Sequence, residues 1–273
     1  MIVDKRTCRQ ALLLLTSLST SIAFPASQPA SQPASQPVNY NSFLSNASKF
    51  LSSIPSKLKH ANPVVQLGGY WGIAGDTQHI PINGAIGDTY DTSEKIDANV
   101  LVGLGVYTKP KDKGIYDLSY GFNMFYLGKT TYKGTITQER LFTNLGYEYD
   151  ITHFPLYFLA KGSKPLKQDK YTFTGDVGIG PNIMFLSRVK ENSLDGGTTI
   201  PDNAFTGGTQ VAFSATLGLG IKINNIYKSI PVECGYRFFY LGQGNFKRTT
   251  NQLLDNLNTG QTFGNAIMCG ISL

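Results

Sequence analysis

Hydrophobic and polar residues alternate with a period of two along most of the chain. In residues 208–222 the odd positions are apolar from Val211 to Ile221, and the even positions carry polar residues, glycine or Lys222. Successive side chains of a β-strand point to opposite faces, so this run predicts a strand with one apolar and one polar face. Residues 96–106 and 116–126 repeat the pattern. Each run is close to the ~9–11 residues with which a tilted strand crosses a bilayer.

The alternation alone fits two folds, a soluble β-sandwich and a membrane β-barrel. A sandwich buries its apolar faces and exposes its polar faces, whereas a membrane barrel turns the apolar face to lipid and encloses the polar one. The two ends of the chain distinguish these folds.

The first 23 residues have the features of a secretory signal peptide. Three basic residues lie within residues 5–9, an apolar stretch opens at residues 11–15, and residues 21–23, Ser-Ile-Ala, fit a cleavage site. Cys8 precedes the apolar stretch, so a lipid-anchored N-terminus is not expected. The mature chain is therefore predicted to leave the cytoplasm.

Net charge and hydropathy restrict the class of protein to which the mature chain can belong. Loss of the signal peptide removes three basic residues and one acidic residue, which lowers the formal net charge from +6 to +4, and only 15% of the residues are charged. These values indicate neither a nucleic-acid partner nor disorder. No later segment has the ~18 consecutive apolar residues of a helical span. Amphipathic strands without a helical span predict a location in the bacterial outer membrane.

Three segments precede the predicted barrel. Residues 1–23 are the signal peptide, residues 24–37 contain the repeat PASQPASQPASQP, and residues 38–62 form a leader with apolar residues on one helical face. The proline-rich repeat predicts an extended linker that cannot bury a core. The leader predicts a short amphipathic helix that either packs under the periplasmic end of the barrel or lies in the membrane interface or the lumen. Residues 63–273 are long enough for one barrel domain.

Ten strands are predicted in the barrel, and eight is the alternative. Long connections at 76–93, 190–207 and 244–261 alternate with short ones, and outer-membrane barrels place long loops outside the cell. One strand through residues 171–187 would put the next long loop on the wrong side, so a break is expected at Gly180-Pro181-Asn182. Eight strands remain the alternative because the apolar parity continues through that break. The predicted strands are 64–75, 94–107, 115–128, 139–150, 155–163, 170–178, 182–189, 208–223, 230–243 and 262–273.

Aromatic residues mark the expected membrane interface. The sequence FYLG occurs at 125–128 and 239–242, each time before an outer loop. Tyr126, Tyr240 and Trp71 share the apolar parity of their strands, which predicts that they face outward in an aromatic girdle.

The last eleven residues, FGNAIMCGISL, place apolar residues at alternate positions from Ile267 to Leu273. This segment is similar to the C-terminal insertion signal of bacterial outer-membrane β-barrel proteins, and residues 63–273 resemble the small OmpA/OmpX-like or opacity-porin-like class. Leu273 stands where that class commonly has phenylalanine. The resemblance implies an all-β, transmembrane, antiparallel up-and-down barrel. It also implies membrane lipid, lipopolysaccharide and the barrel-assembly machinery, through the C-terminal strand, as partners.

The polar parity places charged residues of both signs inside the barrel. The lumen of a barrel of about eight strands is just wide enough to be filled by side chains, and an unpaired buried charge is costly. A lumen packed with ion pairs is therefore predicted, with a narrow channel as the alternative. The predicted inward residues are Gly103, Gly105, Gly121, Gly146, Gly178, Gly218, Gly220, Gly235, Asp97, Asp117, Glu148, Asp176, Lys222, Glu233 and Arg237.

Three histidines bear on a catalytic function, which would need a base beside a nucleophile. His60 lies in the leader and His153 near a predicted periplasmic turn, so only His79 lies in an outer loop. No motif ties it to the acidic and hydroxyl residues there, and the histidines have no metal-ligand spacing with cysteine. We expect no catalysis, no cofactor and no metal. The residues that share the loop with His79 are Asp76, Asp88, Asp91 and Ser93.

Cys234 and Cys269 remain after signal cleavage, on neighbouring predicted strands and almost opposite each other. An oxidising periplasm permits a disulfide, but a bond between adjacent strands requires a demanding geometry. We expect free thiols on the lipid-facing wall, with a disulfide as the alternative.

The long outer loops suggest the function. Residues 191–209 are rich in Thr, Asn, Gly and Asp, and loops carry function when a rigid scaffold displays them. The sequence predicts a structural, surface-exposed, adhesin-like barrel whose outer loops bind a host-surface ligand. A narrow passive channel is the alternative, and a lipid-modifying or proteolytic enzyme is a lesser one.

Overall fold

The computed structural model describes residues 61–166, 170–227 and 230–272. The predicted signal peptide and linker, and the leader up to residue 60, lie outside the described residues. The described residues form strands and loops, and they include no helix of the length and apolarity that a membrane span requires.

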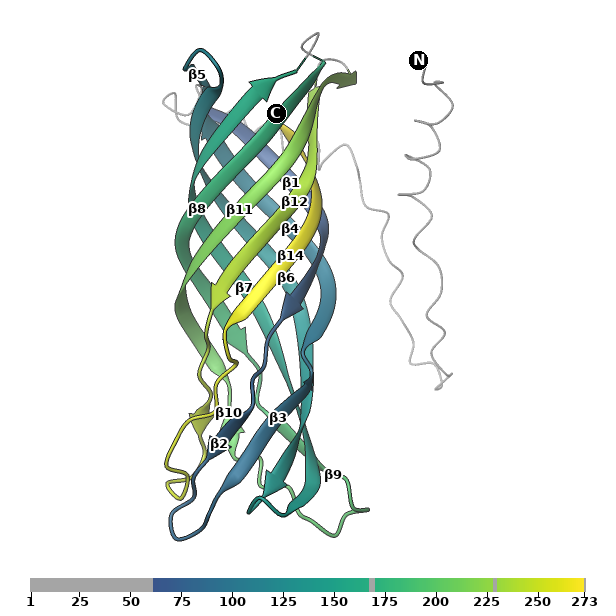
Figure 1. Ribbon diagram of the computed structural model, residues 1–273, viewed down its shortest axis with the longest axis vertical. Coiled ribbons are helices and arrows are strands. Elements are labelled where there is room, and N and C mark those ends of the chain that lie inside the picture. Colours follow the sequence, from purple (N-terminus) through teal and green to yellow (C-terminus); the bar gives the residue numbers. More distant parts are fainter. Residues whose placement is uncertain (1–60, 167–169, 228–229, 273) are drawn as a thin grey trace, which may run out of the picture. The chain divides into compact units, whose positions relative to one another are not determined.

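Long antiparallel strands close into a ring (Figure 1). Each strand of the ring pairs with the next one along the chain, and the last pairs with the first, which confirms an all-β, up-and-down barrel. The ring strands are β1 (Ala61–Ile73), β4 (Ile96–Thr108), β6 (Asp117–Gln138), β7 (Phe142–Pro165), β8 (Tyr171–Leu186), β11 (Gly208–Tyr227), β12 (Ile230–Gly242) and β14 (Thr262–Ser272).

The ring in the described residues has eight strands, so the preferred count of ten is wrong and the alternative holds. Segments 139–150 and 155–163 belong largely to one strand, β7, and segments 170–178 and 182–189 belong largely to β8. Each of the two expected turns is a continuous part of a strand.

Pro181 does not end β8. On the β11 side it pairs with Phe213, and on the β7 side the pairing skips two positions and resumes in the same register. Proline lacks an N–H group, so it interrupts the ladder locally. The neighbouring Gly180 makes this possible, because the carbonyl oxygen of Leu156 lies only 1.8 Å from where a Cβ on Gly180 would stand.

The two longest strands, β6 and β7, extend beyond the ring at one end. They contain 22 and 24 residues, roughly twice the ~9–11 that cross a bilayer. Past the ring, β6 pairs with β3 (Asp88–Glu94) and β7 pairs with β9 (Lys190–Ser193). We call this part the loop extension. It also contains the pairs β2 (Gln78–Ile80) with β3 and β10 (Phe205–Thr206) with β13 (Lys247–Arg248).

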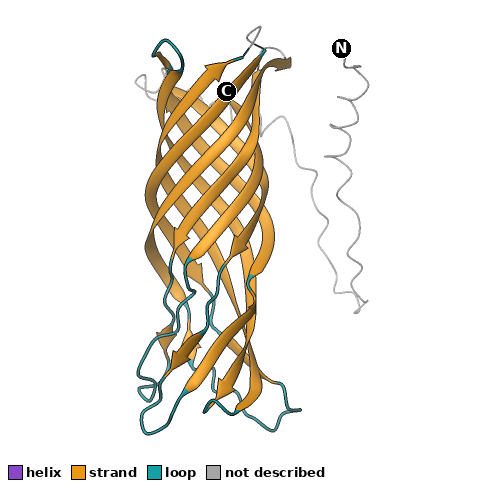
Figure 2. Cartoon of the chain, viewed as in Figure 1, coloured by secondary structure: helices purple, strands orange, loops and turns teal. Residues whose placement is uncertain are grey.

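The connections sort by length between the two ends of the barrel (Figure 2). The loop end carries the connections at 74–95, 187–207 and 243–261, as the sequence predicts. The opposite, turn end carries the short connection at 109–116, which includes β5 (Lys111–Asp112), and both ends of the described chain.

The predicted division into outward and inward residues is confirmed for most of the ring. Between Leu127 and Thr130 a bulge in β6 changes the inward positions from odd to even numbers. Strand β7 keeps odd residues inward, so the prediction that Gly146 and Glu148 face the lumen is wrong. Glu148 instead lies beside Lys190 of β9, with 3.3 Å between Oε1 and Nζ.

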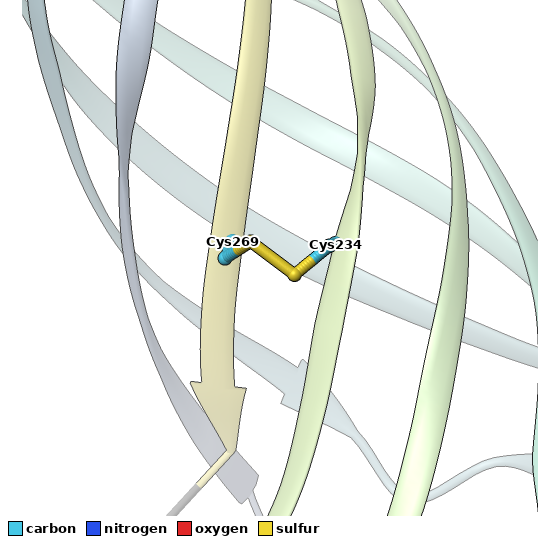
Figure 3. The surroundings of a disulfide bond; sticks show 2 residues. All are labelled: Cys234 and Cys269. Carbon is cyan, nitrogen blue, oxygen red and sulfur yellow. A yellow bond between two sulfur atoms is a disulfide. The ribbon is translucent and has the colours of Figure 1, made fainter. Parts of the chain in front are cut away.

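A disulfide joins β12 to β14 (Figure 3). Both cysteines are exposed and share the outward parity of their strands. Cys234 and Cys269 are directly opposite in the ladder, with their Cα atoms 4.0 Å apart. The closer kind of opposite pair in an antiparallel ladder has Cα atoms ~4.5 Å apart, which brings the two side chains together. The expectation of free thiols is therefore wrong, because the register itself supplies the geometry of the bond.

We predict that Cys234→Ser destabilises the folded barrel by ~2–4 kcal/mol, since the bond links residues 35 positions apart and restricts the unfolded chain. The measurement is the temperature at which the folded band converts to the unfolded band on non-reducing gels. Wild-type protein denatured without reductant should not react with maleimide, and full labelling of both cysteines would contradict the bond.

Candidate functional site

An ion pair lies in the lumen at the turn end. Nζ of Lys161 lies 2.5 Å from Oε2 of Glu233, and the Thr174 hydroxyl donates to the other carboxylate oxygen at 2.8 Å. The ammonium group of Lys161 also lies 5.1 Å from the ring centroid of Tyr107. Each side chain thus has a partner of complementary charge or polarity.

A second ion pair lies deeper in the lumen. Nη2 of Arg237 lies 2.7 Å from Oδ2 of Asp176, and each side chain is only 5% exposed. Nη1 of Arg237 donates to Oγ1 of Thr216 at 3.2 Å, and the guanidinium group lies 5.3 Å from the ring centroid of Phe125. The structure therefore confirms that charges of both signs meet inside the ring.

A layer of aromatic rings then crosses the middle of the lumen. Tyr70, Phe125, Tyr157 and Phe239 are each 1% exposed or less. The ring centroids of Phe125 and Phe239 are 5.4 Å apart, and those of Tyr157 and Phe239 are 6.1 Å apart. Sequence reasoning singled out glycines and charges and missed these rings, although they have the same inward parity. We call these four residues the aromatic layer.

His153 lies inside the ring, and its predicted position near a periplasmic turn is wrong. Its ring is 1% exposed, and Nδ1 lies 2.9 Å from Nδ2 of Asn182. The same amide group donates to the carbonyl oxygen of Leu241 at 2.8 Å. The turn expected near His153 is a continuous part of β7, which places the histidine in the packed interior.

A cluster of buried apolar residues, separate from the aromatic layer, fills the loop extension and holds the outer loops in place. Tyr149 packs on Phe246 with ring centroids 5.0 Å apart, and Tyr90 packs on Phe205 at 5.6 Å. These contacts fix loops 187–207 and 243–261 against β3 and β7. Other buried members are Tyr132, Ile136, Leu145, Tyr147, Leu253 and Leu257.

A cavity of about 280 Å³ lies beside this second cluster at the loop end. We call it the loop-end cavity. Its walls come from β3, β6, β7, β9 and the connections around residues 82, 202 and 250, so segments far apart in the sequence build it. No Lys or Arg is among its described lining residues. The lining includes the apolar residues Ile82, Ile136, Leu145 and Leu253 and the acidic residues Asp88, Glu191 and Asp202.

The three carboxylates of the cavity differ in their surroundings. Glu191 accepts hydrogen bonds from the backbone N–H groups of Asn203 and Ala204, at 2.9 and 3.1 Å, and so anchors loop 187–207. Burial, and then the nearby carboxylates of Glu139, Glu191 and Asp202, raise the pKa of Asp88 above its usual value, against a hydrogen bond from the Glu139 backbone. Negative charge is therefore concentrated in this cavity.

The residues predicted around His79 do not form a catalytic arrangement in the described structure. The ring nitrogens of His79 lie 3.1 Å from Oγ1 of Thr89 and 3.0 Å from the carbonyl oxygen of Ile86. Asp91 instead accepts a hydrogen bond from the Thr77 hydroxyl. Within the described ranges, no three His, Cys, Asp or Glu side chains stand where they could hold a metal ion.

The outward face of the ring decides the class of barrel. Outward positions in the middle of all eight strands carry no Asp, Glu, Lys or Arg, and many are large apolar residues open to the surroundings. An apolar band around a lumen that contains ion pairs is the arrangement of membrane-spanning barrels. The chain folds as an outer-membrane-type β-barrel. Examples of these exposed side chains are Leu67, Val100, Phe122, Phe158, Ile179, Leu217, Tyr236 and Ile267.

Outer-membrane proteins are among the solved structures similar to this barrel. Neisserial surface protein A is 9% identical, with 78% of this chain and 97% of that chain covered and a TM-score of 0.38. OprG from Pseudomonas aeruginosa is 13% identical, with 78% and 97% covered and a TM-score of 0.47. The outer membrane protease OmpT from Escherichia coli is 9% identical, with 78% and 95% covered and a TM-score of 0.41. Sequence identities and TM-scores as low as these assign no activity to this barrel.

No protein-family model and no curated protein matches the sequence.

We predict that Leu217→Arg impairs assembly, because arginine on the lipid-facing wall near the bilayer midplane costs ~2–4 kcal/mol. The fraction of folded, heat-modifiable protein in isolated outer membranes measures the effect. Ile200→Arg is the matched control, since Ile200 is 81% exposed but lies in a connection at the loop end. An equal loss of folded protein in both variants would contradict the assignment of Leu217 to a lipid-facing apolar band.

We predict that Asp176→Asn destabilises the barrel by about 3–5 kcal/mol, because it leaves the buried charge of Arg237 without its partner. Combining Asp176→Leu with Arg237→Met should recover most of that loss. Denaturant unfolding of the purified protein in detergent measures both changes. Independent, additive losses from the two positions would show that the pair is not coupled.

Proposed function

We propose that this protein is a bacterial outer-membrane barrel with a closed lumen, whose loop end acts as a surface-exposed, adhesin-like interaction site. The aromatic layer is the observation that carries this proposal. Tyr70, Phe125, Tyr157 and Phe239 are buried inside the ring and fill its middle. A scaffold with a filled interior is suited to the display of its loops, because the wall that positions them is rigid.

Orientation follows from the lengths of the connections. Outer-membrane barrels place long loops outside the cell and short turns in the periplasm. The loop end carries the three long connections, and Ala61 and Ser272 lie at the opposite end. The loop end therefore faces outward in the proposed arrangement.

The tips of the loop extension expose large apolar side chains. Leu141, in the turn between β6 and β7, and Phe142, the first residue of β7, are 73% and 62% exposed. Ile86, Leu194 and Ile200 in the neighbouring loops are also exposed. These positions lie beyond the wall that faces lipid, and exposed apolar groups that cluster mark sites of interaction. A host-surface protein is the ligand class that we propose for this surface.

The proposed scaffold is favoured over the alternatives by the geometry of the interior. A narrow channel for small solutes would need a continuous wet path through the aromatic layer. A lipid-modifying or proteolytic enzyme would need a nucleophile next to a base, whereas the partners of His79 are Thr89 and the carbonyl of Ile86.

Membrane lipid, lipopolysaccharide and the barrel-assembly machinery complete the proposed partners. The apolar band would contact lipid acyl chains, and the outer leaflet would bring lipopolysaccharide beside it. The assembly machinery would engage β14, the strand that closes the ring against β1.

We predict that an epitope tag inserted between residues 192 and 197 is labelled by antibody on intact cells. A tag at Lys111, in the connection at the turn end, should be labelled only after the outer membrane is permeabilised. Loop tips tolerate insertions, so both tagged proteins should assemble. The heat-modifiable band on gels confirms assembly in each case.

Two results would contradict the proposed function. Labelling at Lys111 on intact cells, with none between residues 192 and 197, would reverse the orientation. Reproducible conductance steps of the purified protein in planar bilayers would show an open path, and the narrow channel would then replace the closed scaffold.

A further inference from the structure

The loop-end cavity has the size of a small-molecule site. Its volume of about 280 Å³ is close to the ~300 Å³ at which ordinary ligand pockets begin. It lies in the loop extension, apart from the ion pairs of the ring. Three buried side chains, Ile136, Leu145 and Leu253, fix part of its wall.

The cavity combines this apolar wall with an acidic one. Asp88, Glu191 and Asp202 line it, although the whole chain has a formal net charge of +6. None of the three forms an ion pair with a Lys or Arg of the described chain. Asp88 and Glu191 are partly buried and Asp202 is exposed. Carboxylates that line one cavity repel each other, so a bound positive charge would be favoured there.

The apolar wall and the acidic wall of the cavity together indicate which kind of cation would bind. A metal ion needs several oxygen ligands around one point. In the described residues the acidic side chains are not grouped in that way. A metal ion or a hydrated ammonium ion would also leave the apolar wall without a partner. A cation that carries an apolar body satisfies both walls.

We propose that the loop-end cavity binds a small organic cation, in which an ammonium group is attached to a compact apolar body. The ammonium group donates to the carboxylates of Asp88 and Asp202. The apolar body packs on Ile136, Leu145 and Leu253. Glu191 has a different role, because its carboxylate holds the backbone of Asn203 and Ala204. This small-molecule site goes beyond the display of loops to a macromolecular partner.

The experiment compares probes of one shape and different charge. Cyclohexylammonium, cyclohexanol and cyclohexanecarboxylate are titrated into the full mature chain in lipid nanodiscs by isothermal calorimetry, with empty nanodiscs as the blank. Cyclohexylammonium should bind at least about tenfold more tightly than cyclohexanol, the ratio that one charge-assisted hydrogen bond supports. Cyclohexanecarboxylate should bind more weakly still.

Matched variants locate the site. Asp88→Asn and Asp202→Asn should each weaken cyclohexylammonium binding by about tenfold. Asp255→Asn removes the same charge from an exposed position that does not line the cavity, and it should leave the affinity unchanged. Asp202 is itself exposed in a loop, so its variant tests the site even where Asp88→Asn assembles poorly.

Three results would overturn the proposal. These are equal affinity for the three probes, affinity for cyclohexylammonium that neither cavity variant changes, and saturable binding of Ca²⁺ in place of the organic cation. The titration uses purified protein, so its failure is separate from a failure of the surface-labelling experiment, which tests orientation in the cell.

Discussion

The structure depends on the backbone pairing of β1 with β14. Ten residues of β1, from Val64 to Ile73, face ten residues of β14 in antiparallel register. In the hydrocarbon core of a bilayer no water is available for an unpaired strand edge, so only a closed ring can satisfy every backbone group. This pairing converts a meander of strands into a ring without an edge, and the outward apolar face then becomes stable in lipid.

The closed ring also decides where function can lie. A ring of eight strands encloses a space that side chains just fill, and the ion pair of Asp176 with Arg237 and the aromatic layer fill it. The interior thus contributes to stability and leaves little room for a ligand. The loop-built part beyond the ring contains both the exposed apolar tips and the loop-end cavity. The proposed ligand recognition therefore lies in the loops rather than in the ring.

Much of this architecture follows from the sequence because a strand has a side-chain period of two. Alternation in residues 208–222 identifies both the outward Leu217 and the inward Ser214, and loop lengths identify the two ends of the barrel. The number of strands could not be obtained in this way. In the sequence, Pro181 indicates the end of a strand. The structure shows that the strand continues, with the Leu156 carbonyl packed closely against Gly180.

Other features depend on distances that a sequence does not contain. The disulfide requires the 4.0 Å between the Cα atoms of Cys234 and Cys269, which the register of β12 and β14 sets. The loop-end cavity requires Asp88 and Asp202, more than a hundred residues apart, to meet across folded loops. The alternation also does not tell which inward residues fill the lumen, since Phe125 and Gly121 have the same parity and differ greatly in size.

The β6–β7 hairpin extends well beyond the wall of the ring. After the bulge at Thr130, β6 continues for residues 130–138, and a strand advances about 3.3 Å per residue. This rigid arm carries the turn at Glu139 and Arg140 up to roughly 30 Å along the strand beyond the wall. The tip of the hairpin is therefore held away from the apolar band of the ring. The extra strand length holds the tip away from the wall, and removing three residue pairs would bring the tip only about 10 Å closer to it.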